Sequence, residues 1–364
     1  MSKPRILMVA TGGTIASAEE GNGLAPQLTG EQLAGYVPQA SQLADIDIVQ
    51  PMNIDSTNMH PADWRHIADA ILERYDGYDG FVVLHGTDTM AYTAAALSYL
   101  IQDSPKPIVL TGSQQPMASP FTDARLNLYQ SVLYAADPSS ADVSVVFGGK
   151  VVAGTRARKQ RTMSANAFVS VNYPELALIR NDRIIRTAPA APEAHAQETR
   201  PPAVPPTAKA ATREDPTAAA APRPLSYRKL DERVFVLKLT PGVTPRTFDL
   251  LRADYEAIII ETFGIGGIPD TLREAIFSWV GSGRILVVTT QVPEEGLDLG
   301  VYEVGRAYSE HPGILKGDDM TTEALVAKTM WALGQTAGLA GAERQARMRE
   351  LFLRPVNHDR LPEG

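Results

Sequence analysis

The sequence contains no cysteine among its 364 residues, which excludes disulfide bonds, thiolate nucleophiles and thiolate metal sites. It also lacks any apolar run near the roughly 20 residues that a membrane-spanning helix needs. Excess positive charge is missing as well: 34 Lys and Arg stand against 42 Asp and Glu, a net charge of −8. We therefore expect no nucleic-acid or membrane partner. The six histidines show no metal-ligand spacing, and we expect neither a metal nor another cofactor.

A secretion signal is absent too. Lys3 and Arg5 lead directly into a strand-like run, which leaves no room for the apolar segment and cleavage site of a signal peptide. We therefore expect a cytoplasmic protein with a small-molecule partner.

Apolar runs alternate with helix-like segments in two parts of the chain. Expected strands are 5–10, 46–51, 80–85, 107–111, 142–147, 233–239, 256–262 and 284–290, and expected helices are 61–75, 89–102, 122–136, 245–253, 270–280 and 321–334. Strands apolar on both faces are typical of a sheet covered on both sides. The sequence predicts an α/β fold: a larger N-terminal doubly wound, mostly parallel sheet domain (1–187) and a smaller C-terminal α/β domain (225–364).

Residues 188–224 differ in composition from the rest. This stretch has 13 Ala, 9 Pro, no aromatic residue and one branched aliphatic, Val204. Such a segment buries too little apolar surface to offset the entropy of ordering, so we predict a disordered linker, with a partner-binding segment as the alternative. Before it, 143–147 and 151–155 flank a Gly-Gly-Lys turn and predict a hairpin that closes the first domain.

Polar side chains and glycines follow four successive predicted strands, at 11–14, 53–58, 85–89 and 111–114. In an open parallel sheet, ligands bind beyond the carboxyl ends of the strands. These four loops, which we call the rim, therefore predict a pocket for a small polar ligand.

The rim offers the parts of a nucleophile–base arrangement. Thr14 and Thr87 are candidate nucleophiles, and glycine pairs such as Gly12-Gly13 let backbone amides approach a ligand oxygen. A lysine beside a carboxylate can serve as the base. Asp88 supplies the acid, and the order of elements makes Lys159 the best-placed lysine.

Each of these features has a simpler explanation. Thr87 or Asp88 before a helix resembles an ordinary N-cap, and Thr-Gly-Gly-Thr resembles a tight strand-to-helix turn. Residues 156–161 resemble a solvated basic run. The Phe-Gly-Ile-Gly-Gly segment at 263–267 hints at a nucleotide loop but lacks the full glycine spacing. Their coincidence on successive strand ends favours the functional interpretation.

At these residues the chain resembles the bacterial-type L-asparaginases, two-domain threonine-dependent amidohydrolases that include glutaminase-asparaginases. The resemblance rests on Thr-Gly-Gly-Thr-Ile-Ala (11–16), Asn-Ile-Asp-Ser-Thr-Asn-Met (53–59), Leu-His-Gly-Thr-Asp-Thr-Met (84–90), Ala-Arg-Lys (157–159), Phe-Gly-Ile-Gly-Gly-Ile-Pro (263–269) and Gly-Asp-Asp-Met-Thr-Thr-Glu-Ala (317–324). It spans nearly the whole chain apart from 188–224 and the residues after about 340.

The resemblance implies hydrolysis of the side-chain amide of L-asparagine, with minor glutaminase activity. Thr14 would attack the amide carbon and form an acyl-enzyme. Thr87, linked to Lys159 and Asp88, would orient the water that releases the product. Asp88 would also bind the substrate α-ammonium group.

The resemblance implies further substrate contacts from Ser56, which would bind the α-carboxylate, and from the neighbouring Thr57. Amides near Gly13 and Thr87 would form the oxyanion site. In the family the site lies between subunits, and an acid from a neighbouring subunit completes it. Glu303 is the best match, and a homo-oligomer, a tetramer built as a dimer of dimers, is implied.

This sequence departs from the family pattern at two places. Many members have a tyrosine in the loop after the first motif that contacts the nucleophile, whereas no tyrosine occurs here between Ile15 and Tyr36. Many members also have Asn where this chain has Gly267.

Two other functions remain open. A non-catalytic amino-acid-binding protein would keep Ser56 and Asp88, although the joint presence of Thr14, Thr87 and Lys159 argues against it. One subunit of the archaeal-type glutamyl-tRNA amidotransferase is a related enzyme with an additional N-terminal domain, whereas this chain opens on its first strand.

Overall fold

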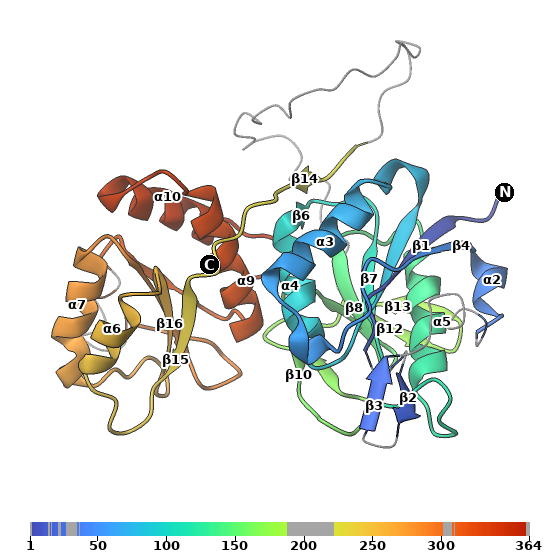
Figure 1. Ribbon diagram of the computed structural model, residues 1–364, viewed down its shortest axis with the longest axis horizontal. Coiled ribbons are helices and arrows are strands. Elements are labelled where there is room, and N and C mark those ends of the chain that lie inside the picture. Colours follow the sequence, from blue (N-terminus) through green and yellow to red (C-terminus); the bar gives the residue numbers. More distant parts are fainter. Residues whose placement is uncertain are drawn as a thin grey trace, which may run out of the picture.

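The computed structural model describes residues 2–13, 15, 17–20, 23–26, 35, 37–187, 222–300, 308 and 310–361. Within them two α/β units lie side by side, the N-terminal one on the right of Figure 1 and the C-terminal one on the left. In this part of the chain, no helix is both long and apolar enough to cross a membrane.

The N-terminal unit is built on an eight-stranded sheet of order β13-β12-β9-β8-β7-β5-β1-β4. Its strands are β1 (Arg5–Ala10), β4 (Asp45–Val49), β5 (Gly80–Leu84), β7 (Ile108–Thr111), β8 (Val143–Phe147), β9 (Lys150–Ala153), β12 (Ala177–Arg180) and β13 (Arg183–Arg186). Five neighbouring strands of this sheet, β8, β7, β5, β1 and β4, pair in parallel. This confirms the predicted α/β fold with a mostly parallel sheet.

Helices cover both faces of this sheet, and alternate residues of β1 divide between two cores. Leu7 and Val9 pack with α3 (Pro61–Leu72) and α4 (Met90–Leu100), whereas Ile6 and Met8 pack with α2 (Ala40–Leu43) and α5 (Ala124–Ala135). Successive side chains of a strand point to opposite faces, so burial on both sides explains why β1 is apolar at every position after Arg5.

The C-terminal unit has a parallel sheet of β15 (Val234–Lys238), β16 (Ala257–Thr262), β17 (Ile285–Thr290) and β18 (Ile314–Lys316). Helices α6 (Arg246–Leu251) and α7 (Arg273–Gly281) pack on one face, and α9 (Thr322–Gln335) packs on the other. In Figure 1, α9 lies between the two units, opposite α4. One apolar core thus runs from β1 through α4 and α9 to β16 and β17.

The predicted hairpin is present as β8 and β9, joined by Gly148 and Gly149 with φ of 59° and 75°. It does not close the domain, because β12 pairs with β9 and extends the sheet. Between them in the chain, β10 (Ala157–Lys159) pairs with β11 (Phe168–Ser170). The expectation of closure was therefore wrong.

The remaining elements are short or peripheral. They are β2 (Ser17–Glu20), β3 (Gly23–Pro26), β6 (Ile101–Gln102), β14 (Leu225–Ser226), α10 (Gly341–Leu353) and the 3-10 turns η2 (Ser56–Asn58), η3 (Tyr75–Gly77) and η5 (Asp270–Leu272). Most of the predicted linker, 188–221, lies outside the described residues. Arg223, at the described end of this predicted linker, forms an ion pair with Asp76, and β14, which follows the linker, pairs with β6 of the N-terminal unit.

Candidate active site

The four rim loops meet at one edge of the large sheet, because the strands that they follow are neighbours in the order β7-β5-β1-β4. Backbone hydrogen bonds continue the ladder beyond the strands. The Thr11 amide donates to the Leu84 carbonyl at 3.0 Å, and the His85 amide donates to the Thr111 carbonyl at 2.8 Å. The predicted convergence of these loops is thus a feature of the fold.

Three of these loops approach one another at backbone distance. Gly13 has φ of +84°, and a Cβ there would lie 2.3 Å from the Gly86 backbone. A Cβ on Gly86 would lie 2.4 Å from the Ser56 hydroxyl oxygen. Both contacts are shorter than real Cβ contacts, so only glycine allows this packing.

The same packing engages the backbone amide of Gly13. The Gly13 amide donates to the Ile54 carbonyl at 3.1 Å, and the Ile54 amide donates to the Thr11 carbonyl at 2.9 Å. The Gly13 N–H therefore holds the first loop against the second. The oxyanion site expected from amides near Gly13 and Thr87 stays a prediction.

At the rim, three side chains predicted from the sequence form one cluster. The Lys159 Nζ lies 2.8 Å from the Thr87 Oγ1 and 2.6 Å from the Asp88 Oδ1. The Lys159 side chain is 17% exposed and that of Asp88 is 56% exposed, so the ion pair is open to solvent on the carboxylate side. A lysine in this position can exchange a proton with the hydroxyl while the carboxylate balances its charge.

Strand pairing brings Lys159 to this cluster. Lys159 ends β10 and is paired with Phe168 of β11, whose ring packs on Phe147 of β8 at a centroid distance of 5.0 Å. The lysine is therefore fixed to the large sheet through its strand partner. Residues 156–161 as a whole are not a solvated basic run, since the Arg156 side chain is fully buried.

Gln114, which sequence reasoning placed in the rim without a role, is the second partner of Thr87. The Thr87 hydroxyl donates to the Gln114 Oε1 at 3.1 Å. The Asp123 carboxylate accepts from the Gln114 backbone N–H at 3.0 Å, and the side-chain amide of Asn127 donates to the same carboxylate. The sequence feature that could have identified this role is the polar side chain of Gln114 in the loop after the fourth predicted strand.

His85 is completely buried and is held by two hydrogen bonds. Its Nδ1 lies 2.7 Å from the Gly86 carbonyl oxygen, and its Nε2 lies 2.8 Å from the Thr93 hydroxyl. Burial lowers the pKa of His85 to about 4, so the imidazole is neutral at neutral pH. These contacts give His85 a structural role, because they tie the third rim loop to α4.

The second rim loop carries Ser56 and Thr57, which the resemblance predicts to contact the substrate. Asp55 accepts from the Thr57 amide at 2.9 Å and caps η2. The Thr89 hydroxyl donates to the Ser56 carbonyl at 2.8 Å, which ties this loop to the start of α4. Ser56 is buried and Thr57 is exposed.

Two predicted site residues, Thr14 and Glu303, lie outside the described residues, as does Tyr36. The structure therefore brings together Thr87, Asp88 and Lys159 and leaves the other two as predictions. Within the described ranges, no group of three His, Asp or Glu side chains is arranged to hold a metal ion.

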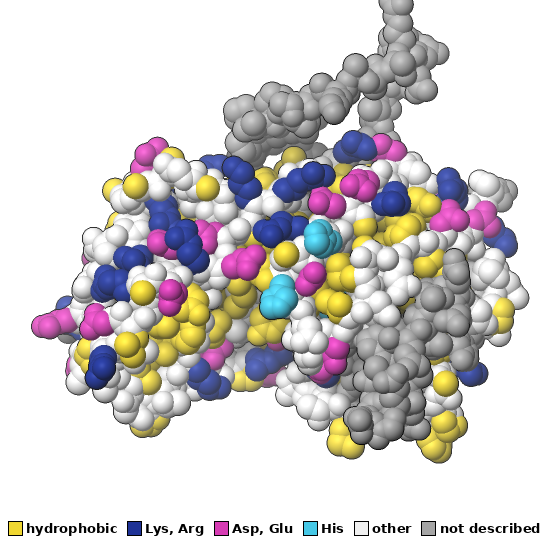
Figure 2. Space-filling view, in the orientation of Figure 1, with side chains coloured by type: hydrophobic (Ala, Val, Ile, Leu, Met, Phe, Trp, Pro, Cys, Tyr) yellow, Lys and Arg dark blue, Asp and Glu magenta, His cyan; other side chains and the backbone are white. Residues whose placement is uncertain are grey.

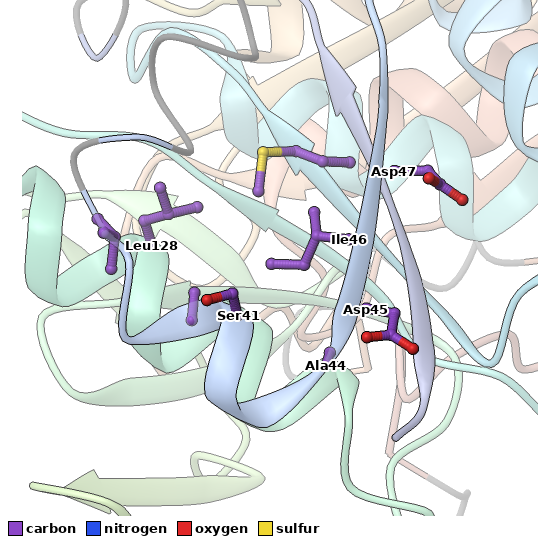
Figure 3. Close-up of a pocket in the computed structure, with 9 residues that line it drawn as sticks. Ser41, Ala44, Asp45, Ile46, Asp47 and Leu128 are labelled. Carbon is purple, nitrogen blue, oxygen red and sulfur yellow. The ribbon is translucent and has the colours of Figure 1, made fainter. Parts of the chain in front are cut away.

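Other candidate regions are less suited to this chemistry. A cavity between α2, α5 and β4 lies toward the amino ends of β1 and β4, away from the rim (Figure 3). Segment 263–267 closes on itself through reciprocal backbone hydrogen bonds between Phe263 and Gly267. Figure 2 shows Lys and Arg side chains interspersed with Asp and Glu on the face in view.

Comparison with known proteins gives the family. Residues 5–191 match the family described as "Asparaginase, N-terminal", and residues 233–346 match "Glutaminase/Asparaginase C-terminal domain". The L-asparaginase of Thermococcus kodakarensis is 36% identical over 340 residues, which cover 92% of this chain and 94% of that protein. One subunit of the glutamyl-tRNA(Gln) amidotransferase of Metallosphaera sedula is 32% identical over 361 residues, which cover 93% of this chain and 74% of that protein.

A solved structure of the thermostable L-asparaginase from Thermococcus kodakarensis matches with a TM-score of 0.81 and 33% identity, covering 99% of this chain and 100% of that one. The shared architecture thus includes both units. With family matches in each of them and similarity along nearly the full chain, the protein belongs to the asparaginase family of amidohydrolases.

Proposed function

We propose that this protein hydrolyses the side-chain amide of L-asparagine to give L-aspartate and ammonia. The observation that carries the proposal is the Lys159–Thr87–Asp88 cluster at the rim, in a chain of the asparaginase family. A mostly buried lysine, a hydroxyl and an exposed carboxylate suit proton transfer beside a small, charged substrate.

The reaction proceeds in two halves. The Thr14 hydroxyl attacks the amide carbon, its proton passes to the departing nitrogen, and ammonia leaves an aspartyl ester on Thr14. Water held by the Thr87 hydroxyl then attacks the ester. The Lys159 ammonium group releases a proton that the departing Thr14 oxygen takes up, and it regains one from the attacking water through Thr87. One amide bond is thereby exchanged for one carboxylic acid and one ammonia. Gln114 keeps the Thr87 hydroxyl oriented, since its Oε1 accepts the hydrogen bond from that hydroxyl at 3.1 Å.

Substrate recognition follows from charge. The Asp88 Oδ1 is paired with Lys159, while the side chain as a whole is 56% exposed and can meet an α-ammonium group from the solvent side. Ser56 and Thr57 offer hydroxyls to the α-carboxylate, and both Ser56 and the Gly13 backbone pack against Gly86. A free amino acid carries both an α-ammonium and an α-carboxylate group, whereas a residue inside a peptide carries neither.

Glutamine differs from asparagine by one methylene, which a pocket discriminates by only about 1–3 kcal/mol, so minor glutaminase activity accompanies the main reaction. Completion of the site by Glu303 of a neighbouring copy, a homotetramer and a cytoplasmic location stay predictions from the sequence.

The test is ammonia release by the purified protein with millimolar L-asparagine and, in parallel, L-glutamine. Thr14→Ala should abolish release, while Thr247→Ala, in a helix of the C-terminal unit, should leave it unchanged. Full activity of Thr14→Ala would remove that residue from the mechanism. Binding of asparagine in calorimetry without any ammonia would instead favour the non-catalytic binding protein.

A further inference from the structure

The last described residues, 356–361, form an irregular segment that contacts both units. The segment lies beyond residue 346, where the match to the family's C-terminal domain ends. Asn357 and His358 have φ of 45° and 63°, in the left-handed region that costs a non-glycine residue about 1–3 kcal/mol. Such a conformation persists only where surrounding contacts determine it.

Asn357 joins this segment to three elements of the N-terminal unit. Its Nδ2 donates to the Ser98 hydroxyl of α4 at 2.8 Å and to the Val143 carbonyl of β8 at 2.8 Å. Its carbonyl accepts from the Thr155 hydroxyl at 2.6 Å. Thr155 lies in the turn that leads into β10.

Arg156, the next residue of that turn, holds the segment more firmly. Its fully buried guanidinium donates to the His358 carbonyl at 2.5 Å through Nε. Its NH1 donates to both the carbonyl and the carboxylate of Asp319, at 3.0 and 2.8 Å. A planar guanidinium can make these bonds in two directions at once, which a lysine ammonium on a single stem cannot reproduce. Arg156, directly before β10, thus connects that strand to the C-terminal segment and to the C-terminal unit.

Asp359 anchors the same segment from the other side. Its fully buried carboxylate accepts from the Tyr99 hydroxyl of α4 at 2.9 Å and from the Lys328 Nζ of α9 at 2.5 Å. Helix α4 begins shortly after Thr87 and Asp88. The segment therefore contacts both elements that meet in the candidate active site, α4 and the turn into β10.

We propose that Arg156 is a positioning residue: it uses the C-terminal segment 356–361 as a fixed support for β10, so that Lys159 stays within hydrogen-bonding distance of Thr87 and Asp88. This inference rests on the proposed function for its catalytic consequence. Misplacing a catalytic group by about 1 Å can cost about 10²-fold in rate. A weakened support should therefore lower turnover without altering the groups that bind substrate.

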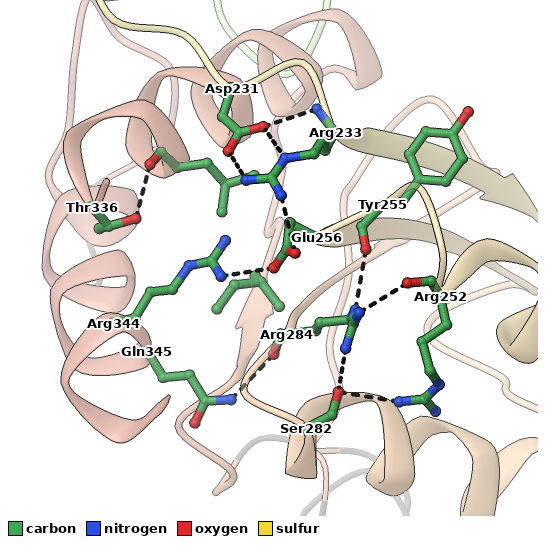
Figure 4. A network of polar contacts seen from close by, with 12 residues as sticks. Asp231, Arg233, Arg252, Tyr255, Glu256, Ser282, Arg284, Thr336, Arg344 and Gln345 are labelled. Carbon is green, nitrogen blue, oxygen red and sulfur yellow. Dashed lines mark hydrogen bonds and ion pairs between the residues drawn. The ribbon is translucent and has the colours of Figure 1, made fainter. Parts of the chain in front are cut away.

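The test compares Arg156→Met with Arg344→Met. Arg344 pairs with Glu256 at 2.7 Å in the polar network of Figure 4, where it joins α10 to the start of β16, away from the rim. Both substitutions remove a partly or fully buried ion-paired arginine, so both should lower the melting temperature. Only Arg156→Met should reduce kcat for asparagine, by about 10- to 100-fold, with KM changed less than about threefold.

Two further variants separate support from general stability. Arg156→Lys can keep the ion pair with Asp319 but loses the bond to the His358 carbonyl, so it should regain much of the melting temperature while kcat stays low. Asn357→Gly keeps the left-handed backbone and removes the amide bonds to Ser98 and Val143, and it should lower kcat in the same direction. Wild-type kcat in Arg156→Met, or an equal loss in Arg344→Met, would overturn the proposal.

Hydrogen exchange followed by mass spectrometry gives a readout independent of turnover. Peptides that cover 157–170 should exchange faster in Arg156→Met than in the wild type or Arg344→Met. If the wild-type protein releases no ammonia, the proposed function fails, and the exchange comparison still decides whether Arg156 supports β10. Unchanged exchange in Arg156→Met would refute that support.

Discussion

Replacing Lys159 by methionine separates a catalytic lysine from a structural one. The substitution removes the Nζ that lies 2.8 Å from the Thr87 Oγ1 and 2.6 Å from the Asp88 Oδ1, and it keeps most of the apolar stem. A positioned acid–base group contributes about 10²- to 10⁴-fold to a rate. That factor corresponds to about 3–5 kcal/mol of transition-state stabilisation, at about 1.36 kcal/mol for each tenfold change.

The expected effect on folding is much smaller. Asp88 is 56% exposed and returns to solvent when its partner is lost, so the ion pair contributes only about 0.2–1 kcal/mol to stability. Thr87 keeps its hydrogen bond to Gln114. The melting temperature should fall by no more than about 4 °C.

The assay is steady-state ammonia release from L-asparagine, with thermal unfolding measured on the same preparation. Lys150→Met is the matched control, since Lys150 forms an ion pair of similar length with Glu175 at 2.7 Å. Lys159→Met should lose at least about 10²-fold in kcat, and adding Thr87→Ala should cost little more, because residues that act as one unit are non-additive. A folded Lys159→Met protein with more than a tenth of wild-type kcat would refute the reasoning.

Three further predictions concern how the structure holds together around the site. Gly13→Ala should lower both the melting temperature and asparagine turnover, because its Cβ would meet the Gly86 backbone at 2.3 Å, whereas Gly77→Ala, with open space at its Cβ, should do neither. Burial lowers the pKa of His85 to about 4, below about 6.5 in the unfolded chain, so the unfolded state binds more protons between these values and stability falls as the pH is lowered through them. Urea unfolding at pH 7 and pH 5 should show about 2 kcal/mol more loss in the wild type than in His85→Gln; equal losses would contradict this. Lys328→Met should cost about 3–5 kcal/mol by leaving the Asp359 carboxylate buried and without its cation, and adding Asp359→Asn should recover part of that loss.

The long strands and helices could be predicted because burial on two sides produces continuous apolar runs. The predicted strand 80–85 is β5, and the predicted helix 89–102 contains α4. By contrast, β10 and β11 have three residues each, too few for a period to show. Helix α10 was missed for a different reason: its sequence is mostly polar, and few of its residues are buried, among them Met348, Leu351 and Phe352.

The meeting of the rim loops was predictable, whereas their hydrogen bonding was not. Parallel topology requires that successive strand ends meet, so the rim followed from strand order alone. Which amide points at a ligand is a different matter. The Gly13 N–H is used by the Ile54 carbonyl of the adjacent loop, and no local pattern in the Thr-Gly-Gly-Thr turn distinguishes that partner from a substrate oxygen.

Contacts across long stretches of chain explain what remains. The contact of Lys159 with Thr87, 72 residues away, was predicted only from the order of elements and the family resemblance, and the contact of Arg156 with His358, 202 residues away, was not predicted. Hydrophobic periodicity indicates which face of an element is buried, but it does not identify a contact partner that lies far away in the sequence. A charge inside the fold is costly unless it is paired, so a buried arginine such as Arg156 implies partners somewhere in the chain. Only the folded chain identifies them, here a carbonyl in the C-terminal segment and Asp319, and thereby connects that segment to the lysine at the rim.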